Sequence, residues 1–373
     1  VPSLNVLGYN STGSINGGAI TGTGVVSLEP SGTANGIASA NRSIYSTLIS
    51  DNQIQNGWFG YAVAGLPDID GDGRGDLIVG APGEAPVNIQ EAGRAYIITG
   101  KMGNIIRTLQ SPGQEVGGHF GVAVSAVPDV NGDGKADVVV GASDEDPGTN
   151  PADTGRAYVY SGATGGLLWK LIPPAATLNQ HFGAAVAGIP DVNGDGRGDI
   201  AVGAPDETYT GSPVNAGRVH IYSGATGLRL YTITAPTPTL RNFFGGSVAG
   251  LADVNGDGRG DIVVGSPETD IGLTTGRPGH AYIFSGATGA LLRTLSSPAN
   301  QADGGFGWSV AAVPDANGDG KPDVVVGSPF ENPGASPLDC GRANLYSGVT
   351  GALLYKFLPP AATANGRFGW SVS

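Results

Sequence analysis

The sequence has little of what most catalytic sites are built from. Its 373 residues include one cysteine, Cys340, so no disulfide can form within the chain. Four histidines are present, but no Ser/His/Asp set, zinc-ligand spacing or phosphate-cradling loop accompanies them, and we expect no enzyme activity. Charged residues make up only 14% and the formal net charge is −13, which argues against nucleic acid as a partner.

Long apolar runs and a recognisable signal peptide are also lacking, so we expect no membrane insertion. The chain begins at Val1, and we interpret it as a mature secreted chain or a trimmed one. Its 65 glycines do not indicate disorder, because 40% of the residues are hydrophobic.

What the sequence does have is acidic residues at fixed spacing. From Asp68 to Asp76, carboxylates stand at positions 1, 3, 5 and 9 and glycines at positions 4 and 6. Alternating carboxylates on a tight turn converge on one point, where a hard cation offsets their repulsion. Oxygen ligands at this density suit Ca²⁺, and the backbone carbonyl of Arg74 at position 7 is a further predicted ligand.

The same loop returns four times, and each first aspartate lies 61, 62, 62 and 62 residues after the one before. We therefore predict about five Ca²⁺ per chain. The predicted ligands are Asp68, Asp70, Asp72, Arg74, Asp76, Asp129, Asn131, Asp133, Lys135, Asp137, Asp191, Asn193, Asp195, Arg197, Asp199, Asp253, Asn255, Asp257, Arg259, Asp261, Asp315, Asn317, Asp319, Lys321 and Asp323. Position 12 is valine in every loop, where an EF-hand needs a glutamate, so the loops are not EF-hands.

Each loop belongs to a repeated unit with the same order of elements. A Phe-Gly pair opens the unit, followed by a short strand, the acidic loop, an apolar strand such as 77–79, and Gly-Ala-Pro or a variant. A variable loop, a third strand such as 157–160, a hairpin turn and a fourth strand such as 167–171 complete it. Four antiparallel strands repeated in this way predict an all-β fold, a β-propeller of four-stranded antiparallel blades.

The ends of the chain bear on the number of blades. We expect one propeller domain over 1–373, in which 1–55 is a diverged partial blade, 56–367 holds five calcium-loop blades and 368–373 is a closing strand. This gives six blades, the last closed by strands from both termini, which removes exposed sheet edges. Two alternatives stay open. One is a fragment of a seven-bladed propeller, and the other is head-to-tail self-association through the terminal strand.

Three motifs recur in order over residues 56–373: Phe-Gly, Asp-x-[Asp/Asn]-Gly-Asp-Gly-x-x-Asp and Gly-[Ala/Ser]-[Pro/Ser]. This set resembles FG-GAP repeats, the blades of the integrin α-subunit head. The resemblance implies a propeller with calcium in loops at one face and an extracellular adhesive or ligand-binding role. Integrin heads have seven blades and usually fewer calcium loops, so five loops here are a departure that leaves the partner open. Fungal lectin propellers that bind calcium look similar as well.

We therefore expect an extracellular calcium-binding propeller that serves as an adhesion or protein-binding module, secreted or at the cell surface. The protein or glycan ligand is expected on the face opposite the calcium loops, where the loops vary most. A calcium-dependent lectin and a structural subunit of a surface layer or filament are the alternatives.

Ion pairs are predicted at the base of the variable loops. A glutamate in the loop is followed by an arginine that opens the third strand, in the pairs Glu84–Arg94, Glu145–Arg156, Glu207–Arg218 and Glu331–Arg342. In the fourth full unit the two slots hold Thr269 and His280, so both members change together. We expect a Glu–Arg bridge in each of the other units.

Other polar and aromatic residues are expected to be structural. His119 and His181 precede Phe-Gly in a slot of mixed composition and are interpreted as loop filler. Tyr61, Trp308 and Trp370 share a position after Phe-Gly and are expected to pack within blades.

Overall fold

The computed structural model describes residues 48–373 apart from 52–53, 55, 87–88, 102, 147–151, 269–276, 333 and 335–337, together with the strands β1 (Asn5–Val6) and β2 (Leu28–Glu29). These residues form five four-stranded antiparallel sheets and the two-stranded pair β1–β2, which confirms the all-β prediction. Within the described part of the chain, no helix is long and apolar enough to cross a membrane.

The five sheets follow one another along the chain, and we call them blades one to five. Blade one has β3 (Ala62–Leu66), β4 (Asp76–Ala81), β5 (Arg94–Ile98) and β6 (Ile105–Leu109). Blade two has β7 (Phe120–Val127), β8 (Asp137–Ala142), β9 (Arg156–Tyr160) and β10 (Leu167–Leu171). Blade three has β11 (Ala185–Ile189), β12 (Asp199–Ala204), β13 (Arg218–Tyr222) and β14 (Arg229–Thr234). Blade four has β15 (Ser247–Leu251), β16 (Asp261–Ser266), β17 (His280–Ser285) and β18 (Leu291–Ser296). Blade five has β19 (Ser309–Val313), β20 (Asp323–Ser328), β21 (Arg342–Tyr346) and β22 (Leu353–Phe357).

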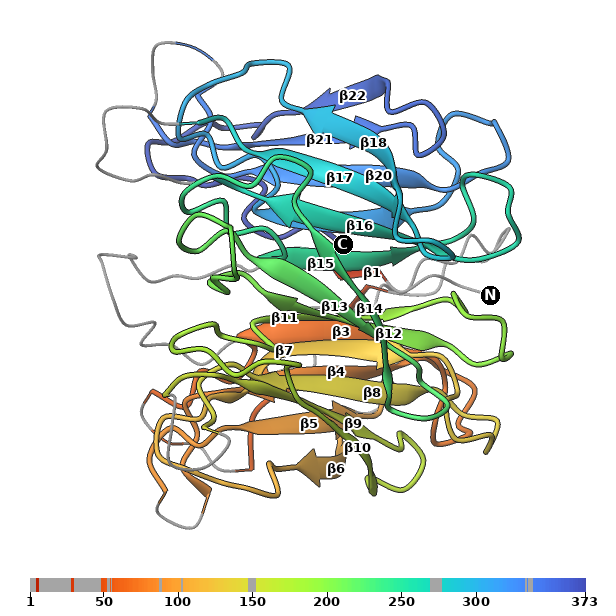
Figure 1. Cartoon of the computed structure of the whole chain (residues 1–373). Coiled ribbons are helices and arrows are strands. Elements are labelled where there is room, and N and C mark those ends of the chain that lie inside the picture. The colour runs from red at the N-terminus through yellow and green to blue at the C-terminus, as the bar shows by residue number, and fades with distance from the viewer. Residues whose placement is uncertain are drawn as a thin grey trace.

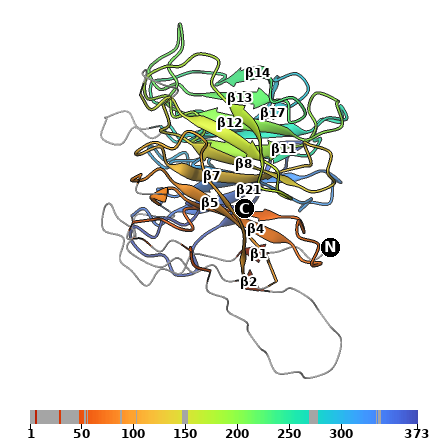
Figure 2. The same ribbon diagram turned by 90° about the horizontal axis from the view of Figure 1, so that it is seen from below.

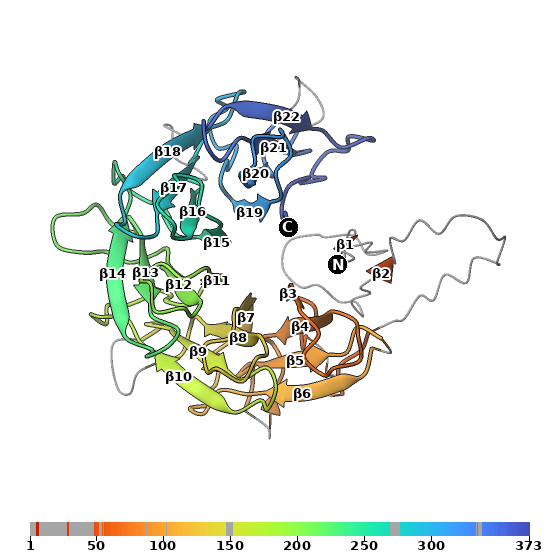
Figure 3. The same ribbon diagram turned by 90° about the vertical axis from the view of Figure 1, so that its right-hand side faces the viewer.

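The blades lie side by side in an arc around a common centre, as in a β-propeller (Figure 3). Within each blade the strands pair in sequence order, with the first strand nearest the centre and the fourth at the rim. Figures 2 and 3 both show the β1–β2 pair outside the five sheets. In Figure 1 the strands run across the picture and the connecting loops gather at their two ends.

The core lies between neighbouring blades. The second strand of every blade is buried along its whole length, because a neighbouring sheet or strand covers each of its faces. The Phe of the Phe-Gly pair fills the space between blades. For example, Phe120 is fully buried with its ring edge-on to Tyr160, at 6.0 Å between centroids.

The glycines of the repeat lie where adjoining blades touch. A Cβ atom on Gly80 would lie 2.0 Å from the carbonyl oxygen of Gly121, which opens the next blade. Gly121 itself has a φ of 93°, a conformation that favours glycine. The glycines of the Phe-Gly and Gly-Ala-Pro motifs therefore allow the backbones of neighbouring blades to approach closely.

The C-terminal residues contact blade five as the start of a further blade would. Phe368 forms a bridge to Gly341, as Phe120 does to Gly93, and the carbonyl of Gly369 lies 2.0 Å from a Cβ built on Gly327. Residues 368–373 form no strand in the structure, and most of the expected N-terminal contribution lies outside the described residues. Closure as six blades therefore stays a prediction.

Candidate functional site

The predicted metal loops connect the first and second strands of each blade. In blade one the backbone pairing of Leu66 with Asp76 closes the loop, and Asp76 is the first residue of β4. The same position, the ninth of the loop, starts the second strand in every blade. Strand pairing therefore holds the two ends of each loop together.

The first aspartate organises the turn. Asp68 Oδ1 accepts the N–H of Gly71 at 2.6 Å, and Asp68 Oδ2 accepts the N–H of Gly73 at 2.8 Å. Both glycines have positive φ, at 85° and 87°. Equivalent pairs of bonds recur in the other four loops. The N–H of Gly73 holds the pKa of Asp68 below its usual range.

The ninth residue ties the loop to the rest of the blade. Asp76 is fully buried, with Oδ2 accepting the N–H of Ile69 at 2.9 Å and Oδ1 accepting that of Gly100 at 3.0 Å. Gly100 belongs to the turn between the third and fourth strands. Burial raises the pKa of the equivalent Asp137 and Asp199 to about 6. A cation beside these carboxyl groups would stabilise their charged form.

Hydroxyl groups from the same turn contact the fifth residue of the loop. This contact was not predicted from the sequence. Thr99 Oγ1 donates to Asp72 Oδ2 at 3.1 Å, and Ser161 Oγ to Asp133 Oδ2 at 3.3 Å. Serines in blades three and four make the same contact. A Ser or Thr before Gly in each hairpin turn was the available clue.

The oxygen donors converge. Asp68, Asp70 and Asp76 bring one carboxylate oxygen each within 4.8 Å of one another. In the other loops the third residue is asparagine, as in Asn131, whose Oδ1 accepts the N–H of Asp133 at 2.8 Å. The donor set consists of carboxylate, amide and backbone oxygens without sulfur or imidazole, and it fits a hard cation such as Ca²⁺.

The Glu–Arg bridges lie at the opposite ends of the strands, and their prediction is confirmed. The four pairs have N–O distances of 3.8, 3.5, 3.2 and 3.7 Å for Arg94–Glu84, Arg156–Glu145, Arg218–Glu207 and Arg342–Glu331. The glutamates are buried, and hydroxyl or imidazole groups supply further bonds: Tyr158 donates to Glu145, while His220 Nε2 lies 2.8 Å from Glu207.

In blade four the prediction of the acidic position was wrong. Glu268 Oε1 lies 3.2 Å from His280 Nδ1, so Glu268 rather than Thr269 occupies the acidic slot; Thr269 is outside the described residues. Glu268 follows Pro267 directly, one position earlier than Glu207 follows Pro205 in blade three, and its backbone has a positive φ of 48°. The loop from Pro267 to His280 is as long as that from Pro205 to Arg218, so equal spacing pointed to Thr269 instead.

His119 and His181 are not loop filler, so that expectation was wrong. His119 Nδ1 lies 2.6 Å from Asp144 Oδ2, and His181 Nδ1 lies 2.8 Å from Asp206 Oδ2. His181 Nε2 also lies 3.4 Å from Asp144 Oδ1, which links the loops of blades two and three. The hydrogen bond that its imidazole donates to Asp144 raises the pKa of His119, and the bond to Asp206 raises that of His181. A separation of 25 residues in both pairs was the available signal.

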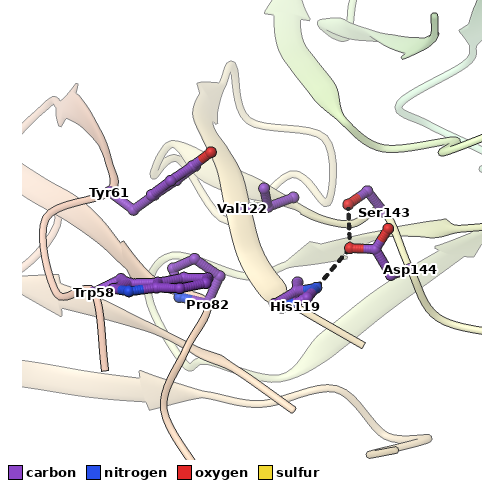
Figure 4. Close-up of a pocket in the computed structure, with 7 residues that line it drawn as sticks. All are labelled: Trp58, Tyr61, Pro82, His119, Val122, Ser143 and Asp144. Carbon is purple, nitrogen blue, oxygen red and sulfur yellow. Dashed lines mark hydrogen bonds and ion pairs between the residues drawn. The ribbon is translucent and has the colours of Figure 1, made fainter. Parts of the chain in front are cut away.

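A pocket of about 270 Å³ lies beside these residues, between blades one and two. Its lining residues are Trp58, Tyr61, Pro82, His119, Val122, Ser143 and Asp144. Figure 4 shows the rings of Trp58 and Tyr61 on one side and the His119–Asp144–Ser143 hydrogen-bonded group on the other. Tyr61 is 56% exposed, so its expected packing role is wrong. Trp308 and Trp370 do pack together, at 4.7 Å between ring centroids.

Comparison with known families identifies FG-GAP repeats at residues 59–98, 120–160, 182–222, 244–284 and 306–341, more than half of the chain. The chain belongs to the FG-GAP repeat family. Each matched FG-GAP segment begins at the Phe of a Phe-Gly pair, and the first four end with the third strand of the blade. The resemblance drawn from the sequence is thereby confirmed.

Relatives of this FG-GAP chain include integrin alpha subunits. Integrin alpha-V of Gallus gallus is 30% identical over 290 residues, which cover 71% of this chain and 26% of the relative. Integrin alpha-PS2 of Drosophila melanogaster is 30% identical over 266 residues, which cover 65% of this chain and 18% of the relative. Integrin alpha-IIb of Homo sapiens is 32% identical over 228 residues, which cover 58% of this chain and 21% of the relative. The matched parts thus span about a quarter or less of the length of these relatives.

Proposed function

We propose that this FG-GAP propeller is an extracellular calcium-binding module for adhesion or protein binding, secreted or held at the cell surface. The observation that carries the proposal is the convergence of three carboxylates, one buried, one half-buried and one exposed, in the first of five loops that share the same backbone contacts. Similarity to integrin alpha subunits supports the adhesive role.

Each loop is proposed to hold one Ca²⁺, or about five per chain. The ligands would be the side chains at positions 1, 3, 5 and 9 and the backbone carbonyl at position 7. A bound ion would offset the repulsion among the loop carboxylates. It would also stabilise the charged form of the buried ninth aspartate, which already ties the loop to the turn between the third and fourth strands.

Metal analysis and thermal unfolding test this step. We expect about five Ca²⁺ per chain and a large fall in Tm on adding a chelator, because the ion binds only the folded loops. Replacing Asp133 with Asn should reduce the calcium count by one. The matched control is Asp51→Asn, which removes an exposed carboxylate outside the loops. A full-length protein without bound calcium, and with the same Tm in chelator, would refute the proposal.

The ligand is proposed to bind on the face opposite the calcium loops, at the pocket of Figure 4. The rings of Trp58 and Tyr61 supply apolar contact area there, and His119 and Asp144 supply polar groups at the edge. Aromatic residues beside a few polar groups are typical of binding sites on rigid scaffolds.

Screening against immobilised extracellular matrix proteins and a glycan array tests the ligand class. Tyr61→Ala should weaken retention at least several-fold, whereas the control Tyr355→Ala, which removes a ring of similar exposure on β22, should not. Retention on the glycan array alone would favour the lectin alternative. Equal binding by both variants would exclude this pocket.

Head-to-tail association is a second candidate because the flank of blade five is less covered than that of blade four. Val325 and Leu345 are 9% and 7% exposed, whereas the equivalent Val263 and Ile283 are fully buried. Light scattering of the purified protein over a range of concentrations tests this idea. A mass equal to one chain at every concentration would exclude filaments or a surface layer.

A further inference from the structure

Basic side chains connect successive metal loops across the blade boundaries. The residue at position 7 of a loop points back toward the first aspartate of the preceding loop. Arg197 Nη1 lies 3.2 Å from Asp129 Oδ2, and Arg259 Nη1 lies 3.4 Å from Asp191 Oδ2. The same relation therefore holds between two pairs of neighbouring blades.

Lysines occupy the same position in two other loops and reach the same partner. Lys321 Nζ lies 3.5 Å from Asp253 Oδ2, and Lys135 Nζ lies 3.1 Å from the backbone oxygen of Asp68. Each of these four cations thus approaches the first residue of the loop one blade earlier. A contact repeated four times with two residue types reflects the construction of the fold rather than one chance side-chain conformation.

The arginines also lie against the mouth of the preceding loop. A Cβ atom on Gly132, at position 4 of the second loop, would lie 2.5 Å from Arg197 Nη2. On Gly194 it would lie 2.1 Å from Arg259 Nη2. Glycine at position 4 therefore gives room for the guanidinium group as well as for the turn.

The two ends of the series lack such a contact. Among the described residues, no cation contacts the carboxylate of Asp315, and the side chain of Arg74 contacts no acidic group. Residues 1–47 contain one acidic residue, Glu29, so the sequence offers no preceding acidic loop for Arg74. Arg74 is therefore a natural reference for the other position-7 residues.

The charge of these groups falls on a predicted ligand oxygen. Asp129 Oδ2, which Arg197 Nη1 approaches to 3.2 Å, also accepts the N–H of Gly134 and belongs to a predicted ligand. The carboxylate of Asp315 instead accepts the N–H groups of Gly318, Asp319 and Gly320. A cation at this distance compensates the loop carboxylates when no metal is bound, and it opposes the approach of a second cation.

We propose that Lys135, Arg197, Arg259 and Lys321 are internal counterions, each of which stabilises the preceding loop without metal and weakens its binding of Ca²⁺. The inference rests on the proposed calcium binding. It makes calcium affinity in blades one to four depend on residues of the next blade, so that the loop of one blade is tuned by its neighbour.

The test compares two variants that lose the same charge. One carries Lys135→Gln, Arg197→Gln, Arg259→Gln and Lys321→Gln. The control carries Arg74→Gln, Lys101→Gln, Lys170→Gln and Lys356→Gln, which removes four cations that make no contact with a first aspartate in the described structure. Calcium affinity is measured by calorimetry in competition with a chelator, and Tm is measured in excess chelator.

We expect the first variant to bind calcium about three- to tenfold more tightly than the control and to have a lower Tm in chelator. The difference should shrink at high salt, because the side chains are partly exposed. Equal affinities, or weaker binding by the first variant, would overturn the proposal. Absence of calcium binding by the unaltered protein would instead overturn the proposed function, and the two failures are therefore distinguishable.

Single variants cover the case in which the quadruple variant does not fold. Arg197→Gln should tighten binding at one site relative to Arg74→Gln, and Arg197→Lys should restore the original affinity because lysine fills this position in two other loops. A purely structural contact would lower Tm in Arg197→Gln with and without calcium alike and leave the affinity unchanged.

Discussion

The two faces of this propeller use repetition differently. On the face of the predicted calcium loops, called the calcium-loop face below, the first and ninth aspartates make the same backbone contacts in all five blades. On the opposite face, an acidic–basic pair recurs at the base of each loop, but the residues above it change. The slot before Phe-Gly holds Trp58, His119, His181, Phe243, Gly305 and Arg367.

This contrast separates structural from recognition roles. Groups that are proposed to converge on one ion, or that neutralise one another in the interior, tolerate little variation, so they recur. The loop tips face solvent and carry different chemistry in each blade, which is what a surface for one specific ligand requires. We call the recurring contacts the repeated layer and the variable loop tips the recognition layer. The following predictions test where the boundary between these two layers lies.

The largest effect is expected at the base of the variable face. Arg156→Met should lower the free energy of unfolding by about 3–5 kcal/mol, because it leaves the buried Glu145 without its cationic partner. The double variant with Glu145→Gln should lose less, since no uncompensated charge is left. Chemical denaturation of the two single variants and the double variant measures this. Additive losses would mean that Glu145 and Arg156 are not energetically coupled. The pair would then belong to the recognition layer.

A smaller effect is expected on the calcium-loop face. Asp199→Asn should lower the free energy of unfolding by about 1–3 kcal/mol in excess calcium, because it removes a charged ligand and weakens a buried hydrogen-bond acceptor. In chelator the loss should be smaller, since burial raises the pKa of Asp199 to about 6 and the ion-free fold then gains little from its charge. The same loss with and without calcium would show that Asp199 holds the backbone only.

Features predictable from sequence lie mainly in the repeated layer. The loops could be recognised because oxygen-bearing residues recur at fixed positions, and each second strand is a continuous apolar run such as 138–140. The Glu–Arg pairs were predictable because a glutamate and an arginine recur at corresponding positions in four repeats. Each of these signals lies within one repeat.

The remainder depended on contacts between repeats. Asp144 contacts His119 of its own repeat and His181 of the next, and only the packing of blades brings the three together. Glu268 was missed because it stands one position before the acidic slot of the other repeats, with a positive φ. Likewise, the position-7 cations reach a loop about one repeat away, so local motifs gave no indication of their partners.

A still smaller effect is expected for the histidines that cross the boundary between the two layers. Hydrogen bonds donated to Asp144 and Asp206 raise the pKa of His119 and His181, respectively, with further contributions from Glu91 and Asp153. Their stabilising contribution is therefore full below about pH 6.5 and is lost as pH rises through the raised values. We expect the double variant His119→Gln/His181→Gln to lose about 0.2–1 kcal/mol at pH 6 and less at pH 8.5, in saturating calcium. Equal losses at both pH values would show that the ion pairs do not stabilise the fold.

The smallest effect on stability should come from the pocket ring. Tyr61 is 56% exposed, and its replacement by alanine should change the free energy of unfolding by no more than about 0.5 kcal/mol. Phe120→Ala also removes a six-membered aromatic ring, but one that is fully buried between blades. It should lower the free energy of unfolding by about 3–5 kcal/mol and serves as the matched contrast. A residue whose removal weakens ligand retention but leaves unfolding unchanged belongs to the recognition layer. If Tyr61→Ala destabilises the protein as Phe120→Ala does, the pocket is part of the blade core, and the division between the two faces must be drawn farther out along the loops.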